Sequence, residues 1–257
     1  MKEKSENISS SISFEDFKNQ ILADYKTIVL SRECSYLGRK EVLSGKAKFG
    51  IFGDGKELPQ VAMSHFFEKG DFRSGYYRDQ TLLFAQENLT PEQLFAALYA
   101  DLDLTREPMS GGRQMGAHFV TPFVDENGNW LPLKEMKNHS SDISPTASQM
   151  PRLVGLAQAS KLFREIPFKG LKEHSDHGNE IAWGTIGNAS TSEGLFFEAI
   201  NAAGVLQIPM VVSVWDDDYG ISVHNKDHTT KESISEVLKG FQRTDTAAGL
   251  EAVSYTH

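Results

Sequence analysis

Hydrophobic positions near the N-terminus follow a helical period. After Ser13, apolar side chains recur every three or four residues at Phe14, Phe17, Ile21, Tyr25 and Ile28. This spacing places them along one face of a helix, and serine is a favoured residue at a helix N-cap. The pattern predicts a long N-terminal helix with one apolar stripe, within an arm that we assign to residues 13–45.

Two further helices are indicated by their start signals and periods. Thr90, Pro91 and Gln93 combine an N-cap, a proline in the first turn and a capping-box partner, and the apolar face that follows is predicted to include Leu94, Phe95, Leu98 and Leu102. Apolar positions between residues 149 and 163 predict another helix.

The region after residue 180 has a different pattern, with continuous apolar runs. Residues 180–187 and 210–215 each form a short, mostly apolar segment, and a helical pattern over 192–206 lies between them. Unbroken apolar runs are typical of parallel strands that are covered on both faces. We therefore predict a right-handed βαβ unit in an α/β fold, with a parallel sheet and helices on both of its faces.

Polar residues follow both predicted strands. Gly187, Asn188 and Ala189 end the first, and the acidic run 216–218 ends the second. Ligands of open parallel sheets bind beyond the carboxyl ends of the strands, so the fold is expected to bring Asn188 and Asp217 together. Their oxygens suit Mg²⁺, and free N–H groups of a helix starting near Thr191 would favour an anion there.

Composition excludes several classes of function. The chain has 257 residues and a formal net charge of −9, which argues against nucleic-acid binding through a basic surface. A single cysteine, Cys34, rules out an intrachain disulfide. No apolar run is long enough to span a bilayer, and the polar residues 1–12 lack the core of a signal peptide. We expect a disordered tail over 1–12 and a cytoplasmic protein without membrane contact.

The βαβ region resembles a known cofactor motif. Residues 187–222 read GNASTSEGLFFEAINAAGVLQIPMVVSVWDDDYGIS. This stretch is similar to the thiamine diphosphate motif of the alpha-type decarboxylating component of 2-oxo acid dehydrogenases. The matching positions are Ser192-Glu193-Gly194, Glu198-Ala199, Asn201, Pro209 and Tyr219-Gly220-Ile221-Ser222.

Three upstream segments extend the resemblance from about Phe14 to about Lys239. They read YYRDQ at 76–80, GGRQMGAHF at 111–119 and DISPTASQMPRLVGLA at 142–157. The second segment is most similar to branched-chain members of the family. The resemblance implies the thiamine diphosphate-binding fold over 46–257, continuing beyond the last residue in a longer protein.

The resemblance also implies a set of cofactor residues. Mg²⁺ would be held by Asn188, Asp217 and the Tyr219 carbonyl, and the diphosphate would be bound by Tyr77 and Arg78. Gly187 and Ala189 would line the diphosphate site. Ser144 and Thr146 would lie on the pyrimidine side of the cofactor. The family has an acid at the position of Asn188 and an asparagine at that of Asp217, so the resemblance implies an exchange of the two side chains with the same total charge. The sequence assigns no catalytic side chain.

Simpler interpretations remain open for several of these residues. Asn188 is also a common turn residue, and Arg78 could form an ordinary ion pair. Asp216 and Asp218 are expected to be partly solvated. His118 is either a structural histidine or a residue that faces the substrate.

The implied function is decarboxylation of a small 2-oxo acid, branched-chain by preference, with acyl transfer to a lipoyl-bearing acyltransferase. The partner would be a beta-type subunit or fused domain that supplies the activating glutamate, in an oligomer, and the chain alone is expected to be inactive. Alternatives are a pyruvate or acetoin dehydrogenase component, or a non-catalytic relative with an altered cofactor motif. A dinucleotide-binding oxidoreductase is disfavoured, because no Gly-x-Gly-x-x-Gly follows the strand.

Overall fold

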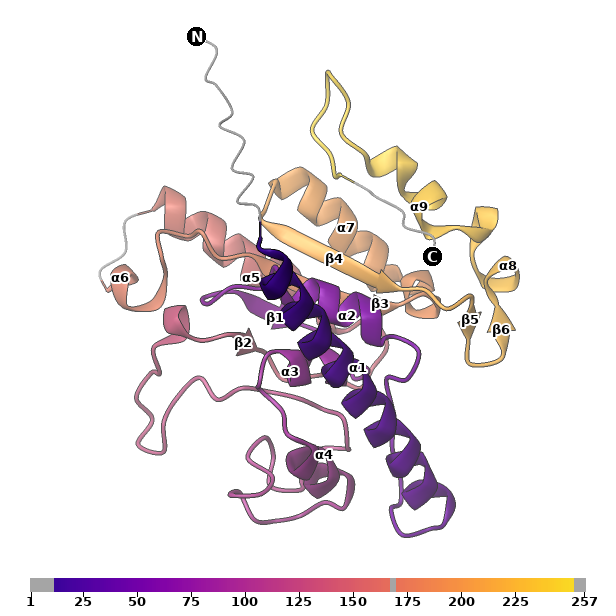
Figure 1. Cartoon of the computed structure of the whole chain (residues 1–257). Coiled ribbons are helices and arrows are strands. Elements are labelled where there is room, and N and C mark those ends of the chain that lie inside the picture. Colours follow the sequence, from indigo (N-terminus) through magenta and orange to yellow (C-terminus); the bar gives the residue numbers. More distant parts are fainter. Residues whose placement is uncertain (1–11, 167–169, 252–257) are drawn as a thin grey trace.

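The centre of the fold is a four-stranded parallel sheet with the order β2-β1-β3-β4 (Figure 1). The computed structural model describes residues 12–166 and 170–251. The strands are β1 (Phe72–Ser74), β2 (Asn138–His139), β3 (Ala182–Gly187) and β4 (Met210–Trp215). The tail predicted over residues 1–12 falls almost entirely outside the described residues.

The predicted βαβ unit is confirmed. Strands β3 and β4 pair in parallel from Ala182 opposite Met210 to Gly187 opposite Trp215, and helix α7 (Gly194–Leu206) connects them. Helix α5 (Gln149–Glu165) packs beside α7 on the same face. A Cβ on Gly184 would lie 2.2 Å from Leu153, so the glycine allows α5 to approach the strand closely.

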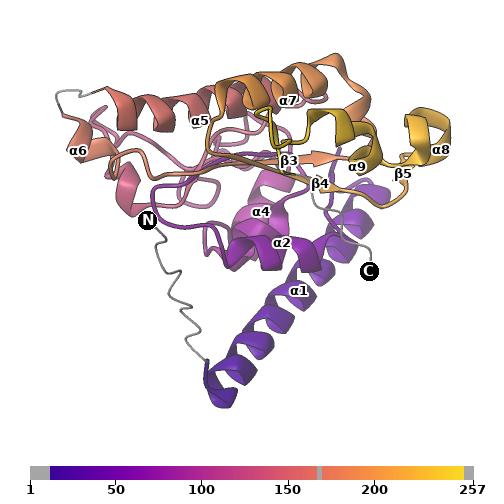
Figure 2. The ribbon, with the colours of Figure 1, turned by 90° about the horizontal axis from the view of Figure 1, so that it is seen from above.

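Helices on the opposite face complete the layered α/β fold (Figure 2). They are α1 (Phe14–Leu43), α2 (Glu57–Ser64), α3 (Gln80–Ala85) and α4 (Pro91–Leu98). A core of Met63, Phe67, Tyr76, Leu82, Trp183 and Trp215 joins this layer to the sheet. The prediction of helices on both faces of a parallel sheet is therefore confirmed.

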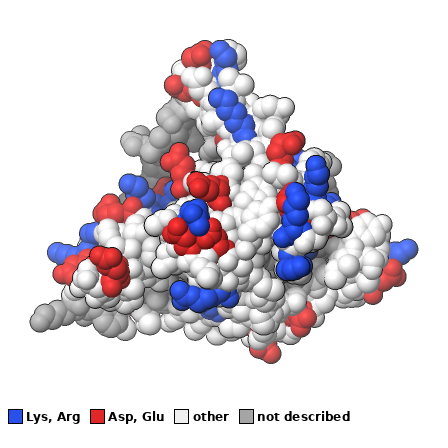
Figure 3. Space-filling model, turned by 90° about the horizontal axis from the view of Figure 1, so that it is seen from below, with Lys and Arg blue, Asp and Glu red and all other residues white. Residues whose placement is uncertain are grey.

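The predicted helix starts are correct, but the apolar faces are less buried than expected. Ser13 caps α1 by accepting the Asp16 N–H, and Thr90 and Gln93 form the capping box of α4. Helix α4 ends at Leu98, so the inclusion of Leu102 in its face was wrong. The predicted stripe of α1 is largely exposed, since Phe14, Phe17, Ile21 and Tyr25 are each at least 49% accessible. Seen from below, acidic and basic side chains are interspersed, with uncharged surface between them (Figure 3).

The remaining elements are short. The helices are α6 (Leu171–His174), α8 (Asn225–His228) and α9 (Ile234–Val237), with 3-10 turns at Leu133–Glu135, Ala189–Ser192, Thr230–Glu232 and Leu238–Phe241. Strands β5 (Tyr219–Gly220) and β6 (Val223–His224) form a small antiparallel pair. Residues 125–130, DENGNW, form a turn that an antiparallel bridge between Val124 and Trp130 closes.

A buried ionic network fixes the sheet below the site. Arg73 is fully buried on β1, and its guanidinium donates to Asp79 and Asp142, at 2.7 Å in each case. Asp79 also accepts from Thr185 on β3 and from the indole of Trp215 on β4. Because buried charges require such compensation, this network holds three strands and the loop after β1 in one arrangement.

Candidate functional site

The candidate site lies where β3 and β4 end at the same edge of the sheet. Gly187 and Trp215 are paired, and the Asn188 N–H donates to the Trp215 carbonyl at 3.4 Å. The prediction that α7 begins near residue 192 was early by two positions. A 3-10 turn comes first, in which the Thr191 N–H and hydroxyl both donate to the Asn188 carbonyl. The Thr191 N–H is therefore not free to bind an anion.

Asn188 is held by a chain of hydrogen bonds that the sequence did not reveal. It is 3% exposed, and its Nδ2 donates to Asn225 Oδ1 at 2.8 Å. Asn225, equally buried, donates its own Nδ2 to Asp216 Oδ1 at 2.9 Å. Because a carboxylate only accepts, Asp216 sets the orientation of the Asn225 amide, which in turn sets that of Asn188. The result is that Asn188 Nδ2 is occupied, whereas its Oδ1 accepts no hydrogen bond within the described residues.

Asp217 has a different partner. Its Oδ2 lies 2.5 Å from the ammonium nitrogen of Lys56, the residue before α2. The Lys56 side chain is only 10% exposed, whereas that of Asp217 is 52% exposed. The fold brings the segments of Asn188 and Asp217 to one edge, as expected, but each side chain is engaged by a separate group. Asp216 is exposed, as predicted, and it also accepts the hydrogen bond from Asn225.

The turn that carries Tyr219 rests against Ala189. A Cβ on Gly220 would lie 2.3 Å from the Ala189 Cβ, so the glycine leaves the space that the Ala189 methyl fills. Asp218 has φ of 71° before β5, and its carboxylate lies 3.3 Å from His224 Nε2. The strained turn brings the backbone of Tyr219 to the site edge beside Ala189.

Arg78 approaches the end of β3 through Tyr76. Its Nε donates to the Tyr76 hydroxyl at 2.7 Å, and a Cβ on Gly187 would lie 3.0 Å from that same hydroxyl. The guanidinium also lies over the Tyr77 ring, 5.5 Å from its centroid, and donates to the Phe52 carbonyl. Burial raises the pKa of Tyr76, which keeps its hydroxyl neutral. Arg78 thus makes no acidic ion pair among the described residues.

A second group of predicted residues meets beside Arg78. The rings of Tyr77 and His118 stack at 6.1 Å, and His118 Nε2 lies 2.7 Å from the Ser144 hydroxyl. Thr146 is exposed on the same loop and makes no side-chain hydrogen bond within the described part of the chain. The segments YYRDQ, GGRQMGAHF and DISPTASQ, far apart in sequence, are therefore neighbours.

The side chains at this edge carry oxygen donors, the atom type that hard cations bind. Over the described ranges, no three His, Cys, Asp or Glu residues are grouped to hold a metal. The available atoms are instead of mixed type: the oriented amide oxygen of Asn188, the half-exposed carboxylate of Asp217 and backbone carbonyls near Tyr219. Magnesium accepts such a set when phosphate oxygens and waters complete its shell.

Lys56 and Asn225 are the residues that sequence reasoning missed. Lys56 lies in the glycine-rich stretch GDGKELPQVA, which reads only as a loop before a helix. Asn225 lies beyond the matched motif. The available signals were weak: a lysine directly before a helix, and an asparagine a few residues after the acidic run.

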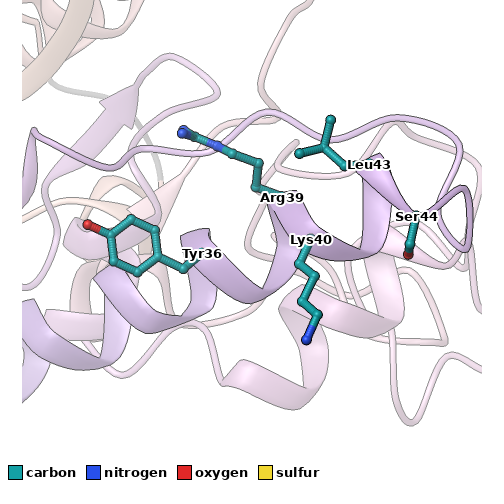
Figure 4. Close-up of a pocket in the computed structure, with 5 residues that line it drawn as sticks. All are labelled: Tyr36, Arg39, Lys40, Leu43 and Ser44. Carbon is teal, nitrogen blue, oxygen red and sulfur yellow. The ribbon is translucent and has the colours of Figure 1, made fainter.

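Two surface hollows lie near the end of α1, and the second extends to Arg78 of the candidate site. One is lined by Tyr36, Arg39, Lys40, Leu43 and Ser44 (Figure 4). The Lys40 and Arg39 side chains point to different sides of the helix, so no group of polar atoms converges there. The other is lined by Arg39, Val42, Leu43, Gly50, Ile51, Phe52 and Arg78.

Comparisons with known proteins identify the family. The model of the dehydrogenase E1 component matches residues 25–243. The chain belongs to the dehydrogenase E1 component family. It is 27% identical over 219 residues to the 2-oxoisovalerate dehydrogenase alpha subunit of Bacillus subtilis (strain 168), covering 84% of this chain and 57% of that protein.

More distant relatives carry related names. The pyruvate dehydrogenase E1 component alpha subunit of Acholeplasma laidlawii is 25% identical, covering 85% of this chain and 52% of that protein. The human mitochondrial 2-oxoisovalerate dehydrogenase alpha subunit is 23% identical, covering 87% and 43%. The chain therefore spans about half the length of the curated relatives that it matches. None of the helices within the described ranges could cross a membrane.

Proposed function

We propose that this E1 family chain forms the alpha-type part of a thiamine diphosphate-dependent 2-oxo acid dehydrogenase. The observation that carries the proposal is the edge formed by β3 and β4. There an oriented oxygen of Asn188 and the Asp217 carboxylate lie at paired strand ends, and Arg78 contacts the Tyr76 hydroxyl that covers Gly187. Oxygen ligands for a cation beside a cationic side chain suit a diphosphate with its metal ion.

Each predicted residue has a role in this proposal. Asn188, Asp217 and the Tyr219 carbonyl would hold Mg²⁺. Arg78, with Tyr77 beneath it, would bind phosphate oxygens, and its lack of an acidic partner in the described ranges leaves its charge available. When bound, the cofactor would supply the electron sink for decarboxylation.

The remaining contacts belong to the bed and the far end of the cofactor. Gly187 and Ala189 would line the diphosphate bed, and the loop of Ser144 and Thr146 would face the pyrimidine side. His118, stacked on Tyr77 and paired with Ser144, would orient the groups next to the substrate.

The preferred substrate class is a branched-chain 2-oxo acid, with pyruvate and acetoin as the alternatives. The support is the GGRQMGAHF segment together with the relatives named 2-oxoisovalerate dehydrogenase. The acyl group would pass to a lipoyl-bearing acyltransferase. We propose a cytoplasmic location.

A beta-type subunit or domain would complete the site. Apolar side chains on the edge strand β4 and on helix α1 are exposed. Val211 on β4 is 36% exposed, and the α1 stripe is exposed from Phe14 to Tyr25. Apolar surface of this extent is typical of an interface, which supports the proposal of an oligomer.

Calorimetric titration of the full-length protein with thiamine diphosphate and Mg²⁺ tests the proposal. We expect saturable binding that weakens in the Arg78→Met variant. A matched control is Arg106→Met, because Arg106 is an exposed arginine paired with Asp101 and Asp103. Wild-type protein that binds no cofactor would support a non-catalytic relative instead. Without its beta-type partner, the chain should show no 2-oxo acid decarboxylation.

A further inference from the structure

Lys56 is a buried cation whose position the proposed roles leave unexplained. Its side chain is 10% exposed, and its ammonium has Asp217 as its acidic partner. The neighbouring Glu57 is already occupied, since it accepts from Arg32 through both carboxylate oxygens at 2.5 and 2.7 Å. Removing an ammonium from water is costly unless a charge compensates it, so Asp217 keeps Lys56 in place.

The loop before Lys56 is firmly attached to the segment of Arg78. A Cβ on Gly53 would lie 2.3 Å from the Arg78 carbonyl, and Gln60 Nε2 donates to the same carbonyl at 2.9 Å. The Arg78 guanidinium donates back to the Phe52 carbonyl. Two cationic side chains, Lys56 and Arg78, are therefore held on one packed unit that faces the ends of β3 and β4.

The charges at this edge explain why the position of Lys56 matters. In the free protein, Lys56 neutralises the one carboxylate that is predicted to bind the metal. A divalent ion at Asp217 must therefore displace the ammonium or approach it closely, which is unfavourable by Coulomb repulsion. A bound diphosphate removes this repulsion, because its oxygens can replace the Asp217 carboxylate as the acceptor for the Lys56 ammonium.

We propose that Lys56 is an exchangeable counter-cation of the phosphate site. This inference rests on the proposed function, which places a diphosphate and a metal ion at this edge. Lys56 pairs with Asp217 while the site is free. When the diphosphate binds, Lys56 moves to a phosphate oxygen and leaves the Asp217 carboxylate to the metal ion. Lys56 thereby makes metal binding dependent on the diphosphate.

The proposal predicts effects of opposite sign for Lys56→Met. Binding of Mn²⁺ alone should become tighter by roughly tenfold, because the competing charge is gone. Binding of inorganic pyrophosphate in saturating Mg²⁺ should become weaker by about 10- to 100-fold, which is the loss of one charge-assisted hydrogen bond. Both affinities are measured by calorimetry on the full-length protein, and pyrophosphate replaces the cofactor so that the thiazole and pyrimidine contacts do not contribute.

Two further variants separate charge from folding. Lys56→Arg keeps the charge and should retain most of the pyrophosphate affinity. Lys46→Met removes the same charge from a 67% exposed side chain that pairs with Glu41 at 3.3 Å, and should change neither affinity. Lys56→Gln serves as a second neutral variant if the methionine protein is unstable.

The outcomes decide between the inference and its basis. Tighter Mn²⁺ with unchanged pyrophosphate would make Lys56 a competitor only, and weakening of both would make it a structural residue. Each of these two results, and also an unchanged affinity for both probes, would contradict the proposed exchange of Lys56 between Asp217 and the diphosphate. The proposed function would still be supported if the wild-type protein binds pyrophosphate or the cofactor. Wild-type protein that binds neither pyrophosphate nor thiamine diphosphate with Mg²⁺ would refute the proposed function itself, and the inference with it.

Discussion

The hydrogen-bond chain from Asp216 through Asn225 to Asn188 can be tested by exchanging two residue types. In Asn225→Asp, the new carboxylate can still accept from Asn188, but it faces the carboxylate of Asp216 across a contact that now measures 2.9 Å. The change removes a bond to a charged acceptor, about 1.5–3 kcal/mol, and adds repulsion between a carboxylate at position 225, which is 3% exposed, and the exposed carboxylate of Asp216. We expect a loss of about 3 kcal/mol in the free energy of unfolding.

Asp216→Asn alone should be mild, about 1 kcal/mol, because an amide oxygen can still accept from Asn225. In the double variant, the amide introduced at position 216 would donate to the carboxylate introduced at position 225, so donors and acceptors again alternate. Most of the lost free energy of unfolding should therefore be recovered. The exception is the exposed hydrogen bond that Asp216 Oδ1 accepts from the Asp218 N–H in the wild type.

Urea denaturation of the wild type, both single variants and the double variant gives the coupling energy, expected at about 1–3 kcal/mol in favour of the pair. Asn129→Asp is the matched control, because Asn129 donates to Asp125 at 3.0 Å in an exposed turn. That change should cost less than about 1 kcal/mol. Additive single losses would show that Asn225 does not transmit the orientation from Asp216, and Asn188 would then lack a fixed amide.

Three further predictions concern the scaffold. Leu153→Ala should lower the free energy of unfolding by about 2–5 kcal/mol in a denaturant titration, because the Leu153 side chain is fully buried against Gly184. A loss below about 1 kcal/mol would mean that the neighbouring side chains fill the cavity that the substitution creates. Arg73→Met leaves two buried carboxylates without their cation and should cost about 3–5 kcal/mol at pH 7, so a stable variant would contradict the network. Burial lowers the pKa of His139 well below its ordinary value. Below about pH 6.5, His139 is therefore protonated in the unfolded chain but stays neutral in the folded chain. Stability should therefore decrease as the pH falls from 6.5, by up to about 1.4 kcal/mol per pH unit, and His139→Asn should remove that part of the slope.

The βαβ unit could be predicted because its signals are local. Two continuous apolar runs flank one helical pattern, and the ends of adjacent parallel strands must meet at one edge. The caps at Ser13 and Thr90 were equally local, since each depends on residues within one helical turn. The approach of Asn188 and Asp217 to the same edge followed from the same reasoning.

The partners of those side chains could not be predicted, because they depend on contacts across the fold. Lys56 reaches Asp217 over 161 positions of sequence, and no periodicity relates them. Asn225 is 37 positions from Asn188, beyond a turn whose course depends on the left-handed backbone of Asp218. The exposure of the α1 stripe was also not evident, because periodicity identifies an apolar face but does not show what covers it.

The place of β1 between β2 and β3 has a consequence for the order of folding. The unit β3-α7-β4 spans consecutive residues 182–215 and needs only local chain closure. By contrast, Asp71 beside β1 bonds to Ile181 across 110 positions, so the centre of the sheet forms only after a long loop closes. Because loop closure costs entropy before the contacts are made, we expect the βαβ unit to assemble first and β1 to insert late. The edge that carries Asn188 would then exist early, but Arg78, which follows β1, would reach it only when the central strand is in place.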